Sequence, residues 1–179
     1  MGELKFYLNV KINNDKQNNT LKLNQSNYTD EMLRRFNMSE CKTSNTPLDH
    51  NQRLSTQTDS EATSGSPEYN TKFPYQEIVG SILYLSQTTR PDVTFSACTL
   101  SFYNNKPNNS HIKAAKRVLR YLKMTKELAL QFNKTNSLVG YCDADWGSNQ
   151  DDRKFISGYI FMYKGAPISW SSKKQQIIL

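Results

Sequence analysis

The stretch from residue 42 to residue 72 most limits how this chain can fold, because it holds almost nothing that a core could bury. Ser, Thr, Asn, Asp, Gly and Pro dominate it, as in the run Ser-Thr-Gln-Thr-Asp-Ser-Glu-Ala-Thr-Ser-Gly-Ser-Pro. Such segments gain too little from burial to offset the entropy lost on ordering. We therefore predict a polar surface linker over 42–72 that separates an N-terminal unit, residues 1–41, from the rest.

The N-terminal unit reads as a β-hairpin followed by a helix. Apolar and polar residues alternate over 4–12, the pattern of a strand with one buried face. A polar stretch over 13–19 predicts a long loop, and the alternation resumes over 20–24. A helix is expected over about 28–36, with Ser26 or Asn27 as its cap.

Three helices are predicted within residues 73–127, which we treat as a helical connection. Residues 76–87 are apolar enough for a core helix. Pro91 suits the first position of a second helix, which would run to about residue 104. A third helix is expected from a cap near Ser110 to about Thr125.

The third helix is strongly amphipathic. At 100° per residue its apolar residues share one arc, and its basic residues share the opposite arc: Lys113, Lys116, Arg117, Arg120 and Lys123. Such a row of cations can neutralise nucleic-acid phosphates, although it is also what an ordinary solvated helix face looks like. Lys and Arg number 23 against 16 Asp and Glu, a net charge of +7, which favours the nucleic-acid interpretation.

The last third of the chain is rich in predicted strands. Short strands are expected over 128–132 and 138–143, and two further strands over 155–163 and 166–171. Lys164-Gly165 between the last two fits a tight turn. Together with the helices, these strands predict an α+β fold that ends in an incomplete mixed sheet.

Acidic residues cluster near the end of the predicted strand over 138–143. They are Asp143, Asp145, Asp151 and Asp152. A carboxylate at the point where a buried strand meets solvent is well placed to bind a hard cation such as Mg²⁺. The competing interpretation is that these residues simply end the strand and fill the following loop, where Asp is common.

Several other classes of protein are disfavoured. No apolar stretch approaches the ~20 residues of a membrane span, and the first residues lack the basic and apolar regions of a signal peptide. The three cysteines, an odd number without C-x-x-C spacing, fit a reducing compartment. His50 and His111 have no evident nucleophilic partner. We expect an intracellular protein, cytoplasmic or nuclear, that is neither secreted nor bound to a membrane.

Collinear blocks along the whole chain resemble one family. Two of them read Tyr-Gln-Glu-Ile-Val-Gly-Ser-Ile-Leu-Tyr-Leu and Gly-Tyr-Cys-Asp-Ala-Asp-Trp. With 2–8, 89–93, 111–123, 152–154, 157–159 and 168–175, these blocks resemble the Pol polyprotein of copia-type LTR retrotransposons. Any single block would be weak evidence, whereas several in one order are strong.

The resemblance implies a role for each part of the chain. Residues 1–41 would be the end of the reverse transcriptase region, with a primer-grip-like hairpin and a thumb-like helix. Residues 73–127 would connect polymerase to nuclease, and 128–179 would begin a ribonuclease H-like domain. Asp143 matches the first metal-binding carboxylate of that domain. The complete family enzyme implies Mg²⁺, an RNA–DNA hybrid as partner, and the remainder of the Pol polyprotein.

The departures from the family pattern shape the functional expectation. The polymerase Asp-Asp motif, the ribonuclease H Glu and the later Asp residues are not among residues 1–179, and a two-metal site needs several carboxylates. We therefore expect no bound cofactor and no catalytic activity from the chain on its own. The alternative is a non-catalytic nucleic-acid-binding module that uses the basic helix, 111–126. A nuclease site assembled across two chains has only Asp143 in its favour.

Two substitutions relative to the family are also notable. Asn9 stands where the family usually has Gly, and Phe155-Ile156 stand where it usually has Ser-Thr. Because the final strands would lack their covering helix, we also predict that the last ~45 residues expose an apolar face and are only marginally stable.

Overall fold

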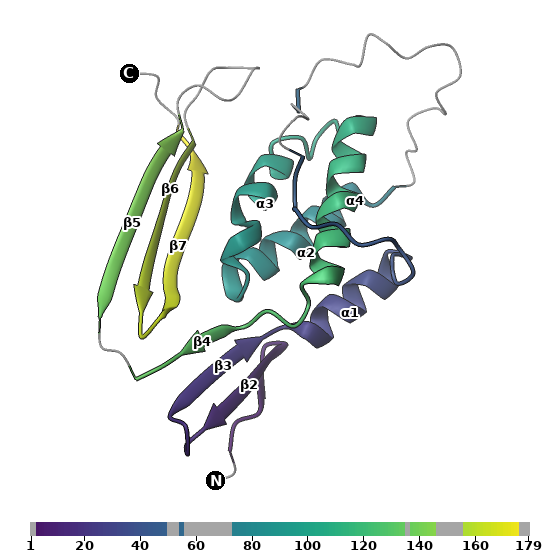
Figure 1. Ribbon diagram of the computed structural model, residues 1–179. Coiled ribbons are helices and arrows are strands. Elements are labelled where there is room, and N and C mark those ends of the chain that lie inside the picture. Colours follow the sequence, from purple (N-terminus) through teal and green to yellow (C-terminus); the bar gives the residue numbers. More distant parts are fainter. Residues whose placement is uncertain (1–2, 50–53, 56–72, 135–136, 146–155, 176–179) are drawn as a thin grey trace, which may run out of the picture.

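The computed structural model describes residues 3–49, 54–55, 73–134, 137–145 and 156–175. Figure 1 shows a group of helices with one small sheet beside it and another below it, which confirms the α+β class. The elements in chain order are β1 (Phe6–Tyr7), β2 (Val10–Asp15), β3 (Thr20–Asn24), α1 (Ser26–Arg35), α2 (Tyr75–Thr88), the 3-10 helix η1 (Pro91–Val93), α3 (Thr94–Ser101), α4 (Asn109–Met124), β4 (Leu130–Phe132), β5 (Leu138–Asp145), β6 (Ile156–Tyr163) and β7 (Ala166–Lys174).

The first sheet begins with a turn that the sequence pattern did not reveal. The single strand predicted over 4–12 is wrong, because the chain reverses at Leu8 and Asn9, whose φ angles are 46° and 61°. β1 and β2 pair antiparallel on either side of this turn. Asn is among the residues that best tolerate this left-handed conformation. The alternation therefore belongs to two short strands.

The second turn of this sheet is tighter than the long loop we predicted. β2 and β3 pair in antiparallel register out to Asp15 and Thr20. The Asp15 carboxylate accepts hydrogen bonds from the backbone N–H groups of Gln17 and Asn18, at 3.0 Å each. An Asp side chain that accepts from the backbone two or three residues ahead stabilises a turn locally.

The strand β4 completes this first sheet. It pairs antiparallel with β3, with Leu23 opposite Leu130 and Leu21 opposite Phe132. The sheet order is β1-β2-β3-β4. We had grouped residues 128–132 with the later strands, whereas the structure places β4 beside the N-terminal hairpin. The apolar residues that β3 and β4 present to one face account for this pairing.

The core lies among the four described helices. Buried residues of α2 and α4 dominate it, joined by Met32 and Leu33 from α1. The cap of α4 is Asn108, two residues before the cap we predicted. Its side chain accepts from the His111 backbone N–H at 3.1 Å, and its own N–H donates to His111 Nδ1 at 3.0 Å. This reciprocal pair is a capping box.

The Thr89–Val93 block ties the helical region together. Arg90 is only 3% exposed, and its guanidinium donates to both carboxylate oxygens of Asp92, at 2.9 and 2.7 Å. The same group donates to the carbonyl and hydroxyl oxygens of Thr125 at the end of α4. Thr89 donates to Gln25 at the start of α1, at 2.9 Å. The motif therefore has a structural role, joining three helix ends.

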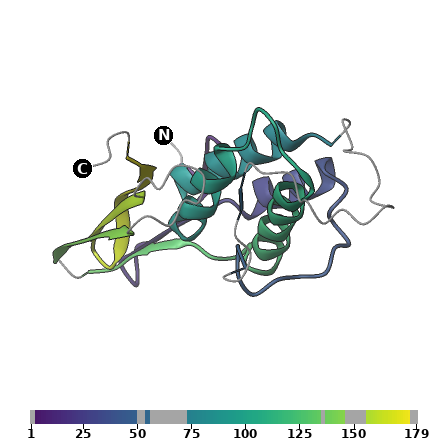
Figure 2. The same cartoon turned by 90° about the horizontal axis from the view of Figure 1, so that it is seen from above.

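The second sheet has the order β5-β6-β7 and is antiparallel throughout its described part, where we expected a mixed sheet. The predicted turn at Lys164-Gly165 is confirmed, with φ angles of 53° and 80°. Trp170 of β7 donates its indole N–H to the Ser86 carbonyl, at 2.6 Å. Lys174 lies 4.8 Å from the Phe102 ring. The sheet is thus attached to the helices through β7, and β5 extends away from them (Figure 2).

Among the described residues, no helix combines the length and the apolar character that crossing a membrane would require.

Candidate nucleic-acid interface and carboxylate cleft

The basic face of α4 forms as predicted, but its cations differ in their surroundings. Lys113 and Arg120 are exposed. Lys116 is half-buried, and its ammonium lies 5.0 Å from the centre of the Phe73 ring. A cation over an aromatic face is attracted by the ring quadrupole. Lys116 therefore contributes partly to packing.

Residues 41–49 run along this face, and we call them the covering segment. Arg117 donates to the Thr46 hydroxyl at 2.9 Å and forms an ion pair with Asp49 at 3.6 Å. Lys123 donates to the Cys41 carbonyl at 2.9 Å. Two of the five predicted nucleic-acid contacts are thus engaged within the chain. The start of the predicted linker has defined contacts with α4, and the remainder of that linker, His50 included, lies outside the described residues apart from 54–55.

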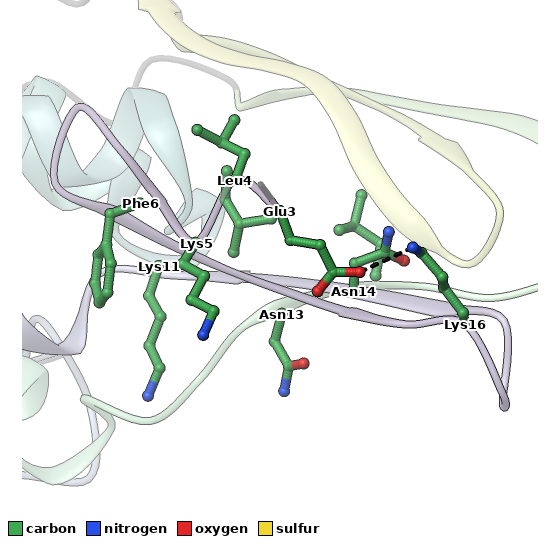
Figure 3. A pocket seen from close by; sticks show the side chains of 10 residues that line it. Glu3, Leu4, Lys5, Phe6, Lys11, Asn13, Asn14 and Lys16 are labelled. Carbon is green, nitrogen blue, oxygen red and sulfur yellow. Dashed lines mark ion pairs between the residues drawn. The ribbon is translucent and has the colours of Figure 1, made fainter. Parts of the chain in front are cut away.

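The first sheet offers a second basic surface, which we call the lysine face. Register places Lys11, Asn13 and Lys22 on one side of the sheet, together with Phe6. Figure 3 shows Lys5 and Lys11 extending in the same direction as Asn13. The surface borders a cavity of about 420 Å³. The lysines of this face are Lys5, Lys11 and Lys22. Among the described residues, none of them forms an ion pair.

The same cavity contains one closed ion pair. Glu3 and Lys16 approach to 2.8 Å. The hydrogen bond with Lys16 holds the pKa of Glu3 below its usual value and raises the pKa of Lys16. Lys16 is therefore less available to an anion than its neighbours on the lysine face.

Sequence reasoning missed the lysine face because of the turn at Leu8 and Asn9. A continuous strand over 4–12 would place Lys11 opposite to Phe6 in side-chain direction, whereas the turn brings them into register on one face. The signal that the sequence offers is Asn9, because Asn tolerates the positive φ that Leu8 and Asn9 adopt in this turn.

Asp143 lies in a cleft of about 560 Å³ between the second sheet and the helices η1 and α3. Its side chain is exposed, and the lining is otherwise aromatic, aliphatic or hydroxyl-bearing, including Phe95, Tyr141, Trp170 and Ser172. Among the described residues of this lining, Asp143 is the one that carries a carboxylate. Of the other predicted acids, Asp145 contributes its backbone to β5, and Asp151 and Asp152 lie outside the described residues.

The described residues do not fit a Mg²⁺ site. Mg²⁺ requires near-octahedral oxygen coordination, commonly with more than one carboxylate or with substrate phosphates. No group of three or more His, Cys, Asp or Glu side chains placed to hold a metal occurs in the described parts of the chain. The weak metal binding that we predict for Asp143 stays a prediction.

Comparison with known proteins places the chain in a family. It is 34% identical to the retrovirus-related Pol polyprotein from transposon TNT 1-94 of Nicotiana tabacum, over 99% of this chain and 13% of that protein. It is 38% identical to the corresponding polyprotein from transposon RE1 of Arabidopsis thaliana, over 87% of this chain and 10% of that protein. The chain belongs to the copia-type retrotransposon Pol polyproteins.

This membership confirms the resemblance drawn from the sequence blocks. The chain spans about an eighth or less of these two Pol polyproteins. A shorter relative, described as secreted RxLR effector protein 161 of Plasmopara viticola, is 44% identical over 59% of this chain and 75% of its own length. No family model matches the chain, and no solved structure does.

Proposed function

We propose that this chain is a nucleic-acid-contacting segment of a Pol polyprotein, without catalytic activity on its own. It would correspond to the end of the reverse transcriptase region and the start of a ribonuclease H-like domain. The observation that carries this proposal is that, in the described parts of the chain, no group of three or more His, Cys, Asp or Glu side chains is placed to hold a metal.

Metal-assisted phosphodiester hydrolysis explains why the number of carboxylates matters. Two ions held about 4 Å apart stabilise the attacking and the leaving oxygen, and several carboxylates are needed to hold them. Asp143 would supply one such ligand once the remaining carboxylates of a Pol polyprotein are added. The described lining of the cleft offers no second carboxylate that could help to position a second ion.

A cleavage assay tests this proposal. The chain is incubated with Mg²⁺ and an end-labelled RNA–DNA hybrid, in parallel with the Asp143→Asn variant. We expect equal and negligible cleavage by both, because neither builds a two-metal site. Cleavage by the native chain that Asp143→Asn abolishes would contradict the proposal.

The nucleic-acid contact is best supported at the lysine face. Lys5, Lys11 and Lys22 are exposed, and among the described residues their ammonium groups take part in no ion pair. The α4 face that we predicted from sequence is partly occupied by the covering segment. We therefore expect a duplex to contact the lysine face first, with Lys113 and Arg120 as a secondary surface.

Salt dependence of hybrid binding distinguishes the two surfaces. Each phosphate neutralised contributes about −0.9 to the slope of log affinity against log salt. The triple variant Lys5→Ala, Lys11→Ala, Lys22→Ala should flatten this slope by about 2 to 3. The matched variant Lys113→Ala, Lys116→Ala, Arg120→Ala should flatten it less. A larger flattening by the α4 variant would place the interface on α4. Slopes that equal that of the native chain in both variants would reject both surfaces.

A further inference from the structure

Arg117 of α4 has hydrogen-bonding capacity that the covering segment leaves unused. Its guanidinium donates to the Thr46 hydroxyl at 2.9 Å and lies 3.6 Å from an Asp49 carboxylate oxygen. The third nitrogen, Nε, is buried and makes no hydrogen bond within the described part of the chain. A guanidinium presents its donors in a fixed fork that matches the oxygens of a phosphate group. The position therefore suits an anion with more acceptor oxygens than the Thr46 hydroxyl offers.

Thr46 also stands in a sequence pattern that accepts phosphate. Of the six prolines in the chain, Pro47 and Pro67 are the two that follow Ser or Thr. Pro47 disfavours a helical conformation at Thr46, and a Ser or Thr followed by Pro is what proline-directed protein kinases phosphorylate. Ser66-Pro67 lies outside the described residues. Thr46 therefore combines the acceptor pattern with an arginine fork that already contacts its hydroxyl.

We propose that Thr46 is a phosphorylation site and that a phosphate there locks the covering segment onto α4. A proline-directed kinase would transfer the γ-phosphoryl group of ATP to Thr46 Oγ1. The Oγ1–P bond forms, the bond between the γ-phosphorus and its bridging oxygen breaks, ADP leaves, and the hydroxyl proton passes to the general base of the kinase. Phosphothreonine carries a charge of about −1.5 to −2 and three acceptor oxygens. Two parallel bonds from the Arg117 fork would then replace the single bond to the hydroxyl.

The covering segment can open so that a kinase reaches Thr46. Residues 41–49 contain neither helix nor strand. Their backbone contacts with α4 include a bond from Lys123 to the Cys41 carbonyl at 2.9 Å and one from the Ser44 N–H to the Arg120 carbonyl at 3.4 Å. Segments without regular backbone hydrogen bonding open locally at low free energy. Opening would present Thr46 to the kinase, and closing would bring the phosphate to Arg117.

The charges around Thr46 favour docking of the phosphate over release of the segment. Asp49 opposes a second negative charge, because it already pairs with Arg117. Lys113 and Arg120 lie one turn before and one turn after Arg117 on the same helix, and both are exposed. Cations thus outnumber the carboxylate at this part of the surface. A phosphate placed against such a basic cluster orders the segment that carries it.

Phosphorylation of the full chain followed by hydrogen exchange tests the proposal. The Ser66→Ala chain is incubated with a proline-directed kinase, ATP and Mg²⁺, and tandem mass spectrometry locates the phosphate. We expect phosphate on Thr46, and none when Thr46→Val is added to the same chain. Amide exchange over residues 43–49 should then slow about tenfold relative to the unmodified chain, because charge-assisted hydrogen bonds are added.

Two arginine variants show whether Arg117 holds the phosphate. Arg117→Lys keeps the charge but removes the fork, so phosphorylation should slow exchange over residues 43–49 by less than about threefold. Arg120→Lys, one turn further along the same face, is the matched control and should retain the full effect. Far-UV circular dichroism should be unchanged in both variants, which separates a lost contact from a lost fold.

Three results would overturn the proposal. The first is kinase treatment that leaves Thr46 unmodified. The second is exchange over residues 43–49 that phosphorylation leaves unchanged or accelerates. The third is an equal loss of the effect in Arg117→Lys and Arg120→Lys, because the phosphate would then respond to the charge of the whole face. None of these measurements involves a nucleic acid or a cleavage reaction, so their outcome is independent of the proposed function.

Discussion

At the scale of single residues, Arg90 is a buried cation whose hydrogen bonds link separate parts of the helical region. Its guanidinium joins η1 to the last turn of α4, and the Tyr121 hydroxyl donates to the same Asp92 carboxylate at 2.9 Å. Five donors in a rigid fork suit Arg, and not Lys, to such a position. The sequence block containing Arg90 supported the family resemblance, and the structure gives this residue a role in packing.

Replacing Arg90 should therefore be costly. Arg90→Met removes the guanidinium donor from the Asp92 carboxylate, which keeps only the Tyr121 hydroxyl, and from the Thr125 carbonyl. We expect a loss of about 3 kcal/mol in the free energy of unfolding. Urea denaturation measures it. Arg34→Met, at an exposed position of α1, is the control and should change stability by less than about 0.5 kcal/mol. Equal effects would show that the buried network adds nothing.

Tyr75 makes stability depend on alkaline pH. Burial raises the pKa of its phenol, whose O–H donates to the Leu100 carbonyl at 2.9 Å. The folded state therefore holds this proton more tightly than the unfolded state does. Its contribution is fully present below the unfolded pKa of about 10 and is lost as the pH rises above it. Urea midpoints should fall above pH 10, and Tyr75→Phe should fall less steeply than Tyr7→Phe.

At the scale of elements, the two left-handed turns show what local sequence can and cannot reveal. Lys164-Gly165 has a Gly in the turn and was predicted. Leu8-Asn9 was not, because Leu at positive φ is a strained choice and the surrounding residues alternate like a strand. The Gly that the family resemblance implies at position 9 would suit this turn, and Asn also tolerates positive φ. The departure at Asn9 is therefore compatible with the same backbone.

Improving that turn should stabilise the first sheet. The double variant Leu8→Asn, Asn9→Gly installs the dipeptide that best accepts positive φ at both positions. We expect a gain of about 1 kcal/mol in the free energy of unfolding. The Tyr84 hydroxyl donates to the Leu8 carbonyl, a backbone contact that the change leaves intact. Thermal unfolding beside Leu4→Asn, exposed but outside the turn, checks the result. No gain would mean that the turn is unstrained.

Composition did not predict that the covering segment would bind to α4. Residues 42–49 are polar and were expected to form only a linker, yet Thr46 and Asp49 bind Arg117. Composition reports what a segment can bury, and it does not report hydrogen bonds to a partner distant in sequence. The basic face itself was predictable, because a helical period of charge needs only local residues.

At the scale of the whole molecule, the second sheet is held by few contacts. β7 is anchored to α2 and α3, whereas every described side chain of β5 from Leu138 to Asp143 is exposed. Regions with little buried apolar surface open at lower free energy than the core. Hydrogen exchange should therefore be faster in β5 than in α2 and α4. Comparable protection in all three would contradict this weak attachment.

Trp170 provides a sharper test of the same attachment. Trp170→Phe keeps an aromatic ring but removes the indole donor to Ser86. Exchange should accelerate across β5, β6 and β7 while protection in α4 stays unchanged. Ile168→Val, at an exposed position of the same strand, is the control. Loss of protection throughout the chain would show that the two regions unfold as one unit.

The sequence predicted the types of most elements, but not the assignment of strands to sheets. The helix at α4 and the strands β6 and β7 follow from local periodicity. The partner of β4 does not, because Leu130 and Leu23 are far apart in the chain and nothing local distinguishes β3 from β5 as a neighbour. The residues that line the cleft around Asp143 could not be predicted for the same reason, because a site depends on which distant residues come together.

The neighbouring positions of β3 and β4 mean that the helices between them leave and re-enter one sheet about 5 Å apart. A stretch of polypeptide whose two ends meet in this way can be lengthened, shortened or exchanged without displacing the strands that flank it. The helical region is thus an insertion between two paired strands. Its length can therefore vary while β3 and β4 stay paired, although the second sheet depends on it through Trp170 and Ser86.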